Sequence, residues 1–128
     1  MKEKQTHSIT LESTCKITDE ICLPDTKLPS VVIVGGGFAG LALVEKLKHK
    51  EVQVVLLDKN NFHQFQPLLY QVATSALEPD SIVFPFRKQI NGYKNVFFRL
   101  AEVVEIQPDS NTILTNKGSI SYDYLVLA

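Results

Sequence analysis

The pattern of apolar and polar residues changes abruptly at Ser30. Residues 31–34 (VVIV) form a β-branched run of the kind that is buried on both faces of a parallel sheet, and residues 52–58 (VQVVLLD) form a second. Between them, three glycines precede a segment whose apolar residues recur with helical spacing and which fades near residues 49–50. The pattern predicts a strand, helix and strand within about 30 residues, which is a βαβ unit.

The region after the second strand is expected to hold little regular structure. We predict a loop followed by a short helix from about Leu68 to Leu77, with Pro67 near its start. Residues 81–90 (SIVFPFRKQI) predict another brief helical turn, broken by Pro85.

From Val96 onward the pattern is rich in strands. The runs at residues 96–107, 112–115 and 119–128 are separated by the turn sequences PDSN and NKG. We expect a small antiparallel meander, after which the chain returns to the parallel sheet. Residues 1–29 lack periodicity and predict a flexible leader.

Composition narrows the class of protein. With 128 residues, 45% hydrophobic and 21% charged, the chain has the composition of one soluble domain. A formal charge of −1 argues against nucleic acid or an anionic membrane as a partner. Cys15 and Cys22 match neither a zinc-site nor a redox spacing, so we expect plain thiols in a reducing cytoplasm and no metal site. No apolar run approaches the ~20 residues of a membrane span.

A glycine motif, Gly35-x-Gly37-x-x-Gly40, lies between the first strand and the helix. In this context the first glycine permits the tight turn, the second lets a pyrophosphate approach the backbone, and the third lets the helix pack closely on the sheet. The free N–H groups at the start of the helix then face two phosphates. The candidate cofactor-binding residues are therefore Gly35, Gly36, Gly37, Phe38, Ala39 and Gly40.

An acidic residue completes the motif. Asp58 ends the second strand 18 residues after Gly40, where its carboxylate can accept hydrogen bonds from the adenosine ribose and would repel a 2′-phosphate. The pattern thus predicts a dinucleotide site and argues against NADP. Because an NAD-type domain usually continues through further helices and parallel strands, the strand-rich tail favours FAD. The predicted fold class is α/β, a Rossmann-like FAD-binding βαβ with a parallel sheet and a small antiparallel meander.

The sequence resembles the flavoproteins with two dinucleotide-binding domains, in which the first glycine motif binds FAD and a later one binds NAD(P)H. The resemblance rests on residues 31–41 (VVIVGGGFAGL), on Asp58, and on residues 121–128 (SYDYLVLA), which look like the start of the family's D-x-L-V-L-A-T-G motif. It implies that the backbone of Val103 meets the adenine ring and that Lys59 and Asn60 touch the ribose or pyrophosphate; a buried strand valine is the alternative at Val103.

Within that superfamily, residues 58–87 look like type II NADH dehydrogenase, with an F-x-P-L-L-Y-x-V-A core at residues 65–73. Since no cysteine follows Cys22, the disulfide-reductase branch is disfavoured. The resemblance implies that NADH reduces FAD by hydride transfer and that two electrons then pass to a membrane quinone. Residues 67–74 either pass near the flavin ring or merely pack on the sheet. His63 is expected to be a loop or capping histidine. Arg87 is expected to face solvent or to be paired, and the alternative is that it reaches a phosphate.

The resemblance also predicts what lies outside this sequence. We expect residues 30–128 to be the N-terminal part of an FAD/NAD(P)-binding Rossmann-like domain, truncated before the second domain, soluble and inactive alone, with its catalytic residues elsewhere. The full-length enzyme would sit peripherally on the cytoplasmic side of the inner membrane through regions absent here, and a homodimer remains open. Two alternatives stay open: a stand-alone nucleotide-binding module, and a fragment of a sulfide:quinone oxidoreductase.

Overall fold

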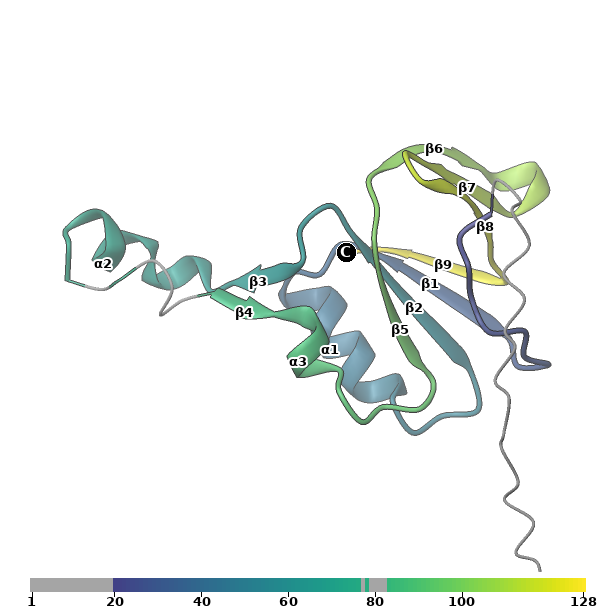
Figure 1. The fold of residues 1–128 in the computed structure, drawn as a ribbon, viewed down its shortest axis with the longest axis horizontal. Helices are drawn as coiled ribbons and strands as arrows, with labels where there is room; N and C mark the ends of the chain where they lie inside the picture. The colour runs from purple at the N-terminus through teal and green to yellow at the C-terminus, as the bar shows by residue number, and fades with distance from the viewer. Residues whose placement is uncertain (1–19, 77, 79–82) are drawn as a thin grey trace, which may run out of the picture.

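The structure is a computed structural model that describes residues 20–76, 78 and 83–128. Its centre is a parallel sheet with strand order β5-β2-β1-β9 (Figure 1). The strands are β1 (Ser30–Val34), β2 (Gln53–Asp58), β5 (Val96–Leu100) and β9 (Tyr124–Leu127). The predicted return of the chain to the parallel sheet is confirmed, because β9 pairs in parallel with β1.

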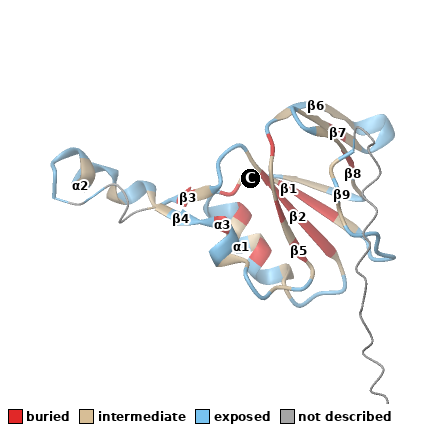
Figure 2. Cartoon of the chain, viewed as in Figure 1, coloured by how far each residue is buried: buried red, intermediate tan, exposed pale blue. Residues whose placement is uncertain are grey.

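Both faces of this sheet are covered, as the β-branched runs predict. Residues Val31 and Ile33 of β1 belong to a buried cluster that includes Val44 of helix α1 (Phe38–Leu47). The intervening residue, Val32, belongs to a second cluster on the opposite face. Figure 2 shows the buried residues concentrated in the central strands. Because side chains alternate along a strand, a run that is apolar at every position requires cover on both faces.

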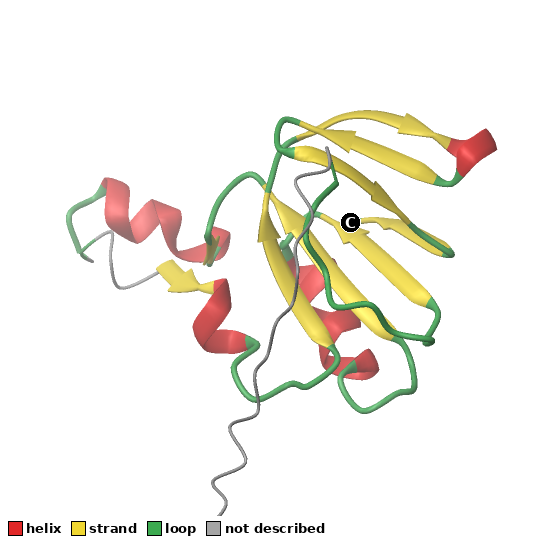
Figure 3. Cartoon of the chain, turned by 45° about the vertical axis from the view of Figure 1, so that its right-hand side comes forward, coloured by secondary structure: helices red, strands yellow, loops and turns green. Residues whose placement is uncertain are grey.

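The second face is covered by the predicted antiparallel meander, which is confirmed. Its strands are β6 (Val103–Gln107), β7 (Thr112–Thr115) and β8 (Gly118–Ser121), in that order. Ile113 and Ile120 pack from this sheet against Val32 and its neighbours. Figure 3 shows the antiparallel strands beside the parallel ones. The fold is thus a helix layer, a parallel sheet and a small antiparallel sheet.

The strand-like run at residues 96–107 forms two strands in different sheets. β5 pairs with β2 in the parallel sheet, and β6 pairs with β7 in the meander. The change of sheet occurs at the buried Ala101, whose N–H donates to the carbonyl oxygen of Asp58 at 3.0 Å. This short link places the start of β6 next to the end of β2.

The segment at residues 59–85 differs from the prediction. Part of the expected loop is a strand, β3 (Phe62–Gln64), which pairs antiparallel with β4 (Val83–Pro85). The expected helix is reduced to a 3₁₀ turn, η1 (Gln66–Leu68), and α2 (Leu69–Ala73), while Leu77 lies outside the described residues. Neither η1 nor α2 buries a residue, so no apolar face packs to extend the helix. Figure 1 shows this segment projecting away from the sheet.

The prediction that Pro85 breaks a helical turn is wrong. Pro85 ends β4 with φ −61° and ψ 128°, and it directly precedes helix α3 (Phe86–Gln89). Its missing N–H and fixed φ suit both the end of a two-stranded ribbon and the start of a helix. The position matters because it delivers Phe86, 1% exposed, to the core beneath α1.

Residues 20–23 lie beside the meander, and the chain then runs to the start of β2, where Gln53 donates to the carbonyl oxygens of Pro24 and Pro29. Ile21 and Leu23 pack against the second core cluster, and the N–H of Ile21 donates to the carbonyl oxygen of Ser119 at 2.8 Å. The Arg99 guanidinium donates to the carbonyl oxygen of Cys22, whose thiol is free. The rest of the predicted leader, with Cys15, lies outside the described residues. Among the helices of the described ranges, none is long and apolar enough to cross a membrane.

Candidate functional site

The glycine motif forms the turn between β1 and α1 at the carboxyl end of the parallel sheet. Gly35 has φ +104°, a backbone conformation that residues other than glycine rarely adopt. Its N–H donates to the carbonyl oxygen of Leu57 at 2.9 Å. A Cβ on Gly35 would lie 2.2 Å from the carbonyl oxygen of Ala128. The predicted role of Gly35 in the tight turn is confirmed.

Gly36 is held on three sides. Its N–H donates to Oδ2 of Asp58 at 2.7 Å, and its carbonyl oxygen lies 3.0 Å from Nδ1 of His63. A Cβ on this residue would lie 2.1 Å from Cζ of Phe86. The motif treats this position as variable, but in this fold a side chain here would require the Phe86 ring to shift.

Gly37 and Gly40 differ in the space around them. A Cβ on Gly40 would lie 2.0 Å from the carbonyl oxygen of Gly35 and 3.5 Å from Cγ2 of Ile33 in β1, so the predicted close packing of the helix on the sheet is confirmed. By contrast, a Cβ on Gly37 would meet no atom within 4 Å. Gly37 is exposed and directly precedes α1, where the first backbone N–H groups of a helix have no partner within it. Within the described residues, the space at Gly37 is therefore open for an anion.

Asp58 binds the backbone on both sides of the site. Besides the bond from Gly36, its Oδ1 accepts the N–H of Asn60 at 2.7 Å. The sequence predicts a ribose contact for this side chain but not these two bonds. Since an ionised carboxylate offers about four acceptor positions, the two bonds leave capacity for ribose hydroxyls. The ribose contact itself stays a prediction.

Two hollows meet at Asp58. One has a volume of about 330 Å³ and is lined by residues 35–38, Phe62, His63 and Phe86 among others. The second has a volume of about 370 Å³ and is lined by residues 34–35, 57–60 and 101–103. Gly35, Asp58 and Asn60 line both. The structure thus brings together the glycine turn, the acid, Lys59, Asn60 and Val103. Of the other two candidates, Gly40 packs behind the turn and Ala39 is exposed on the first turn of α1.

His63 is the residue that sequence reasoning misplaced. It lies in strand β3, is 8% exposed, and its ring makes an edge-to-face contact with Phe38 at 5.0 Å between centroids. The prediction that His63 is a loop or capping histidine is therefore wrong. The sequence also does not predict that Phe86 lies against Gly36. The three-residue strands β3 and β4 are too short for a residue pattern to indicate where His63 and Phe86 lie. Arg87 is exposed, as expected.

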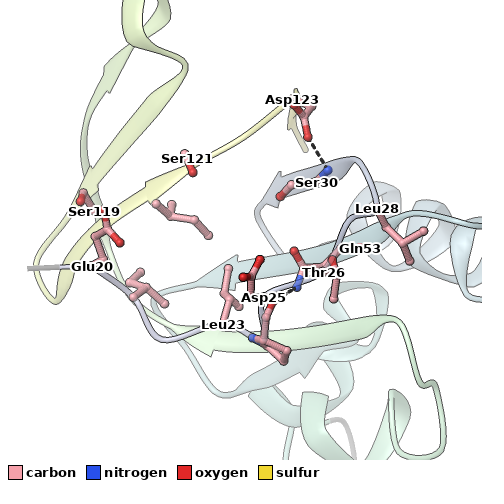
Figure 4. A pocket seen from close by; sticks show the side chains of 13 residues that line it. Glu20, Leu23, Asp25, Thr26, Leu28, Ser30, Gln53, Ser119, Ser121 and Asp123 are labelled. Carbon is pink, nitrogen blue, oxygen red and sulfur yellow. Dashed lines mark hydrogen bonds between the residues drawn. The ribbon is translucent and has the colours of Figure 1, made fainter. Parts of the chain in front are cut away.

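A further hollow of about 350 Å³ lies at the opposite, amino end of the parallel strands (Figure 4). There Oδ2 of Asp123 accepts the N–H of Ser30 at 2.7 Å, and Gln53 donates to the carbonyl oxygen of Pro24 at 2.9 Å. Ligands of open parallel sheets bind at the carboxyl ends of the strands, which favours the glycine turn over this hollow. No cluster that could hold a metal ion exists among the described residues.

Comparison with known proteins agrees with this geometry. Residues 29–128 match the family model described as pyridine nucleotide-disulphide oxidoreductase. The chain belongs to this family. Among curated members, a type II NADH:quinone oxidoreductase of Mycobacterium tuberculosis is 38% identical over 102 residues, which is 77% of this chain and 22% of that protein. The corresponding Staphylococcus aureus enzyme is 31% identical over 102 residues, 77% of this chain and 25% of that protein. The chain thus spans about a quarter of the length of these relatives.

Solved structures of the same superfamily share the fold. The sulfide:quinone oxidoreductase of Aquifex aeolicus superposes with a TM-score of 0.72 at 28% identity, covering 77% of this chain and 24% of that one. The NDH2 of Plasmodium falciparum, solved in complex with NADH, also has a TM-score of 0.72, at 23% identity, covering 79% of this chain and 22% of that one. The second likeness shows the fold alone.

Proposed function

We propose that residues 30–128 bind the ADP half of FAD and form the N-terminal part of a flavin-dependent NADH:quinone oxidoreductase. The observation that carries the proposal is the contrast at the glycine turn. Side chains at Gly35, Gly36 and Gly40 would collide with the protein, whereas a side chain at Gly37 would enter open space at the start of α1. That space adjoins a carboxylate at the end of β2, which is the arrangement a dinucleotide needs.

Each predicted residue has a distinct task in this proposal. The free N–H groups at the start of α1 bind the pyrophosphate, and the open face of Gly37 lets it approach. Asp58 accepts hydrogen bonds from the adenosine ribose, while Lys59 and Asn60 border the ribose and pyrophosphate. The backbone of Val103, at the other wall of the second hollow, meets the adenine. Bound FAD would supply the hydride-accepting chemistry, and these residues would bind and orient its ADP half.

The relatives support the choice of reaction. The curated relatives named above are NADH:quinone oxidoreductases, and NADH and a quinone are therefore the proposed substrates. Because the chain spans about a quarter of those proteins, the activity is proposed for a protein of their length that contains these residues. We place such a protein peripherally on the cytoplasmic side of the inner membrane.

Anaerobic flavin spectroscopy on a protein of that length tests this function. We expect NADH to bleach the flavin absorbance and a soluble quinone to restore it. The likeness to a sulfide:quinone oxidoreductase makes sulfide the natural competing reductant. Bleaching of the flavin by sulfide but not by NADH would contradict the proposed reaction and favour the oxidation of sulfide by a quinone. A protein that holds flavin but is reduced by neither would contradict both and would favour a stand-alone binding module.

A further inference from the structure

His63 contacts the glycine turn at the carbonyl oxygen of Gly36, the residue whose N–H binds Asp58. Its Nδ1 lies 3.0 Å from the carbonyl oxygen of Gly36, while the N–H of the same glycine donates to Asp58. His63 comes from strand β3, outside the βαβ unit that forms the rest of the turn. The Gly36 backbone is therefore fixed through both of its polar groups by side chains from two different elements.

We propose that His63 is a positioning residue for phosphate binding, which fixes the Gly36–Gly37 peptide so that the Gly37 N–H is presented to the cofactor. The proposal rests on the proposed function, since the phosphates are those of FAD. A trans peptide is planar, with its C=O and N–H on opposite sides, and the described chain contains no cis peptide bond. Anchoring the Gly36 carbonyl oxygen on His63 therefore also sets the direction of the Gly37 N–H, away from the imidazole.

The hydrogen bond requires a hydrogen on Nδ1 of the His63 imidazole. A backbone carbonyl oxygen can only accept, so Nδ1 of His63 carries the hydrogen and donates it. In the neutral side chain Nε2 is then the acceptor. The chemistry of the contact thus predicts one tautomer, which is measurable without any ligand.

The surroundings of His63 hold its ring in place. It makes edge-to-face contact with Phe38 at 5.0 Å between centroids and lies 6.5 Å from the ring of Phe86. In the β3–β4 ribbon its register partner is Phe84. Because the ring is buried in this aromatic setting, it can keep a fixed direction toward Gly36. The same setting means that packing alone is the competing explanation for its position.

Two substitutions separate hydrogen bonding from packing. In His63→Asn the amide nitrogen stands near the place of Nδ1 and can still donate, whereas in His63→Leu the volume is largely filled but the donor is gone. We expect His63→Leu to weaken FAD binding by the 128-residue chain about tenfold, the loss typical of one hydrogen bond, and His63→Asn by less than about threefold. Equal losses in the two variants, or no loss in either, would overturn the proposal. ADP serves as a second probe, because only the ADP half contacts this turn.

A second measurement does not depend on FAD. The ¹⁵N chemical shifts of the His63 ring in the ligand-free chain report its tautomer, and we expect the hydrogen on Nδ1. A hydrogen on Nε2 with a bare Nδ1 would overturn the proposal, because a bare Nδ1 cannot bond to a carbonyl oxygen. If the wild-type chain bound neither FAD nor ADP, the proposed function would fail. The tautomer would then still decide whether His63 anchors the turn.

Discussion

The N–H of Gly36 donates to Oδ2 of Asp58 at 2.7 Å, which joins the turn after β1 to the last residue of β2. The acid that the sequence assigns to a ribose thus also binds the glycine turn in the protein itself. Its other oxygen binds the N–H of Asn60. Asp58 therefore shapes the site as well as lining it, and its loss should affect both stability and ligand binding.

Asp58→Asn should destabilise the fold by about 1–3 kcal/mol, because one of its two backbone donors would face an NH₂ group in place of an acceptor. Denaturant unfolding of the 128-residue chain measures this loss. The matched control is Asp123→Asn, whose Oδ2 accepts the N–H of Ser30 at 2.7 Å, a bond that an amide oxygen can keep. Equal losses in the two variants would contradict the double role of Asp58.

The same acid should exclude a 2′-phosphate. We expect ADP to displace FAD from the wild-type chain and adenosine 2′,5′-bisphosphate to fail, since the Asp58 carboxylate would face the extra phosphate. Competition titrations at low salt measure this, and Asp58→Asn should narrow the difference between the two competitors. If both ligands competed equally in the wild type, Asp58 would not face the ribose.

Gly36 and Gly37 should respond oppositely to alanine. Gly36→Ala places a Cβ 2.1 Å from the Phe86 ring in the core, so we expect a loss of about 1–3 kcal/mol, the range for overpacking. Gly37→Ala places a Cβ in open space at φ −72°, so it adds no clash, and its cost should stay below about 1 kcal/mol, the loss expected for alanine at an N-cap position. Urea unfolding compares the two. A large loss in Gly37→Ala would mean that the open space is filled by the protein.

Asn95 ties the end of α1 to the start of β2. Its Nδ2 donates toward the carbonyl oxygens of Leu47, Lys50 and Val52, at 3.0, 3.1 and 2.9 Å. Asn95→Ala should cost about 1–3 kcal/mol by leaving these acceptors without their donor. Asn95→Asp should cost more at pH 7, because a carboxylate would face three carbonyl oxygens. The gap between the two variants should narrow in acid, where the carboxyl becomes a donor, and a gap independent of pH would contradict this reasoning.

The ion pair of Glu45 and Lys48 near the end of α1 should make a small contribution that depends on pH. Hydrogen bonding to Lys48, and then to Tyr93, lowers the pKa of Glu45 below its usual value of 4.5. The hydrogen bond with Glu45 raises the pKa of Lys48 above its usual 10.5. The pair therefore stabilises the fold between these limits: the Glu45 contribution is lost as the pH falls through its folded pKa, and the Lys48 contribution as the pH rises through its own.

A pH series of urea midpoints for the wild type and Glu45→Gln tests this sign. The wild type should be the more stable near pH 7, and the difference should close in acid and shrink at high salt, because the pair is exposed. A difference that grew in acid would contradict the assignment.

The βαβ unit and the meander were predictable because their sequence patterns reflect local burial. Residues 31–34 of β1 and 54–57 of β2 are apolar at every position because both faces of the sheet are covered. The division between β5 and β6 was not predictable, because the chain changes sheets at Ala101 without a glycine or proline to mark the change. The β3–β4 ribbon escaped prediction for another reason, as its three-residue strands pair only through tertiary structure.

In the site, the glycines and Asp58 were predictable because their spacing follows from the geometry of one turn and one strand end. His63, Phe86 and Ala128 complete the same turn, but they reach it from distant parts of the chain. No local pattern records such contacts. The preference for glycine at Gly36 depends on one of them, the ring of Phe86.

The central claim is that the open space at Gly37 receives the pyrophosphate of FAD. Calorimetric titration of FAD into the wild-type 128-residue chain and into Gly37→Val tests it most directly, with urea unfolding of both chains as the control for folding. We predict that the wild type binds FAD and is competed by ADP, and that Gly37→Val remains folded but loses binding, because its side chain fills the space that the pyrophosphate needs. Unchanged FAD affinity in a folded Gly37→Val chain would contradict the claim.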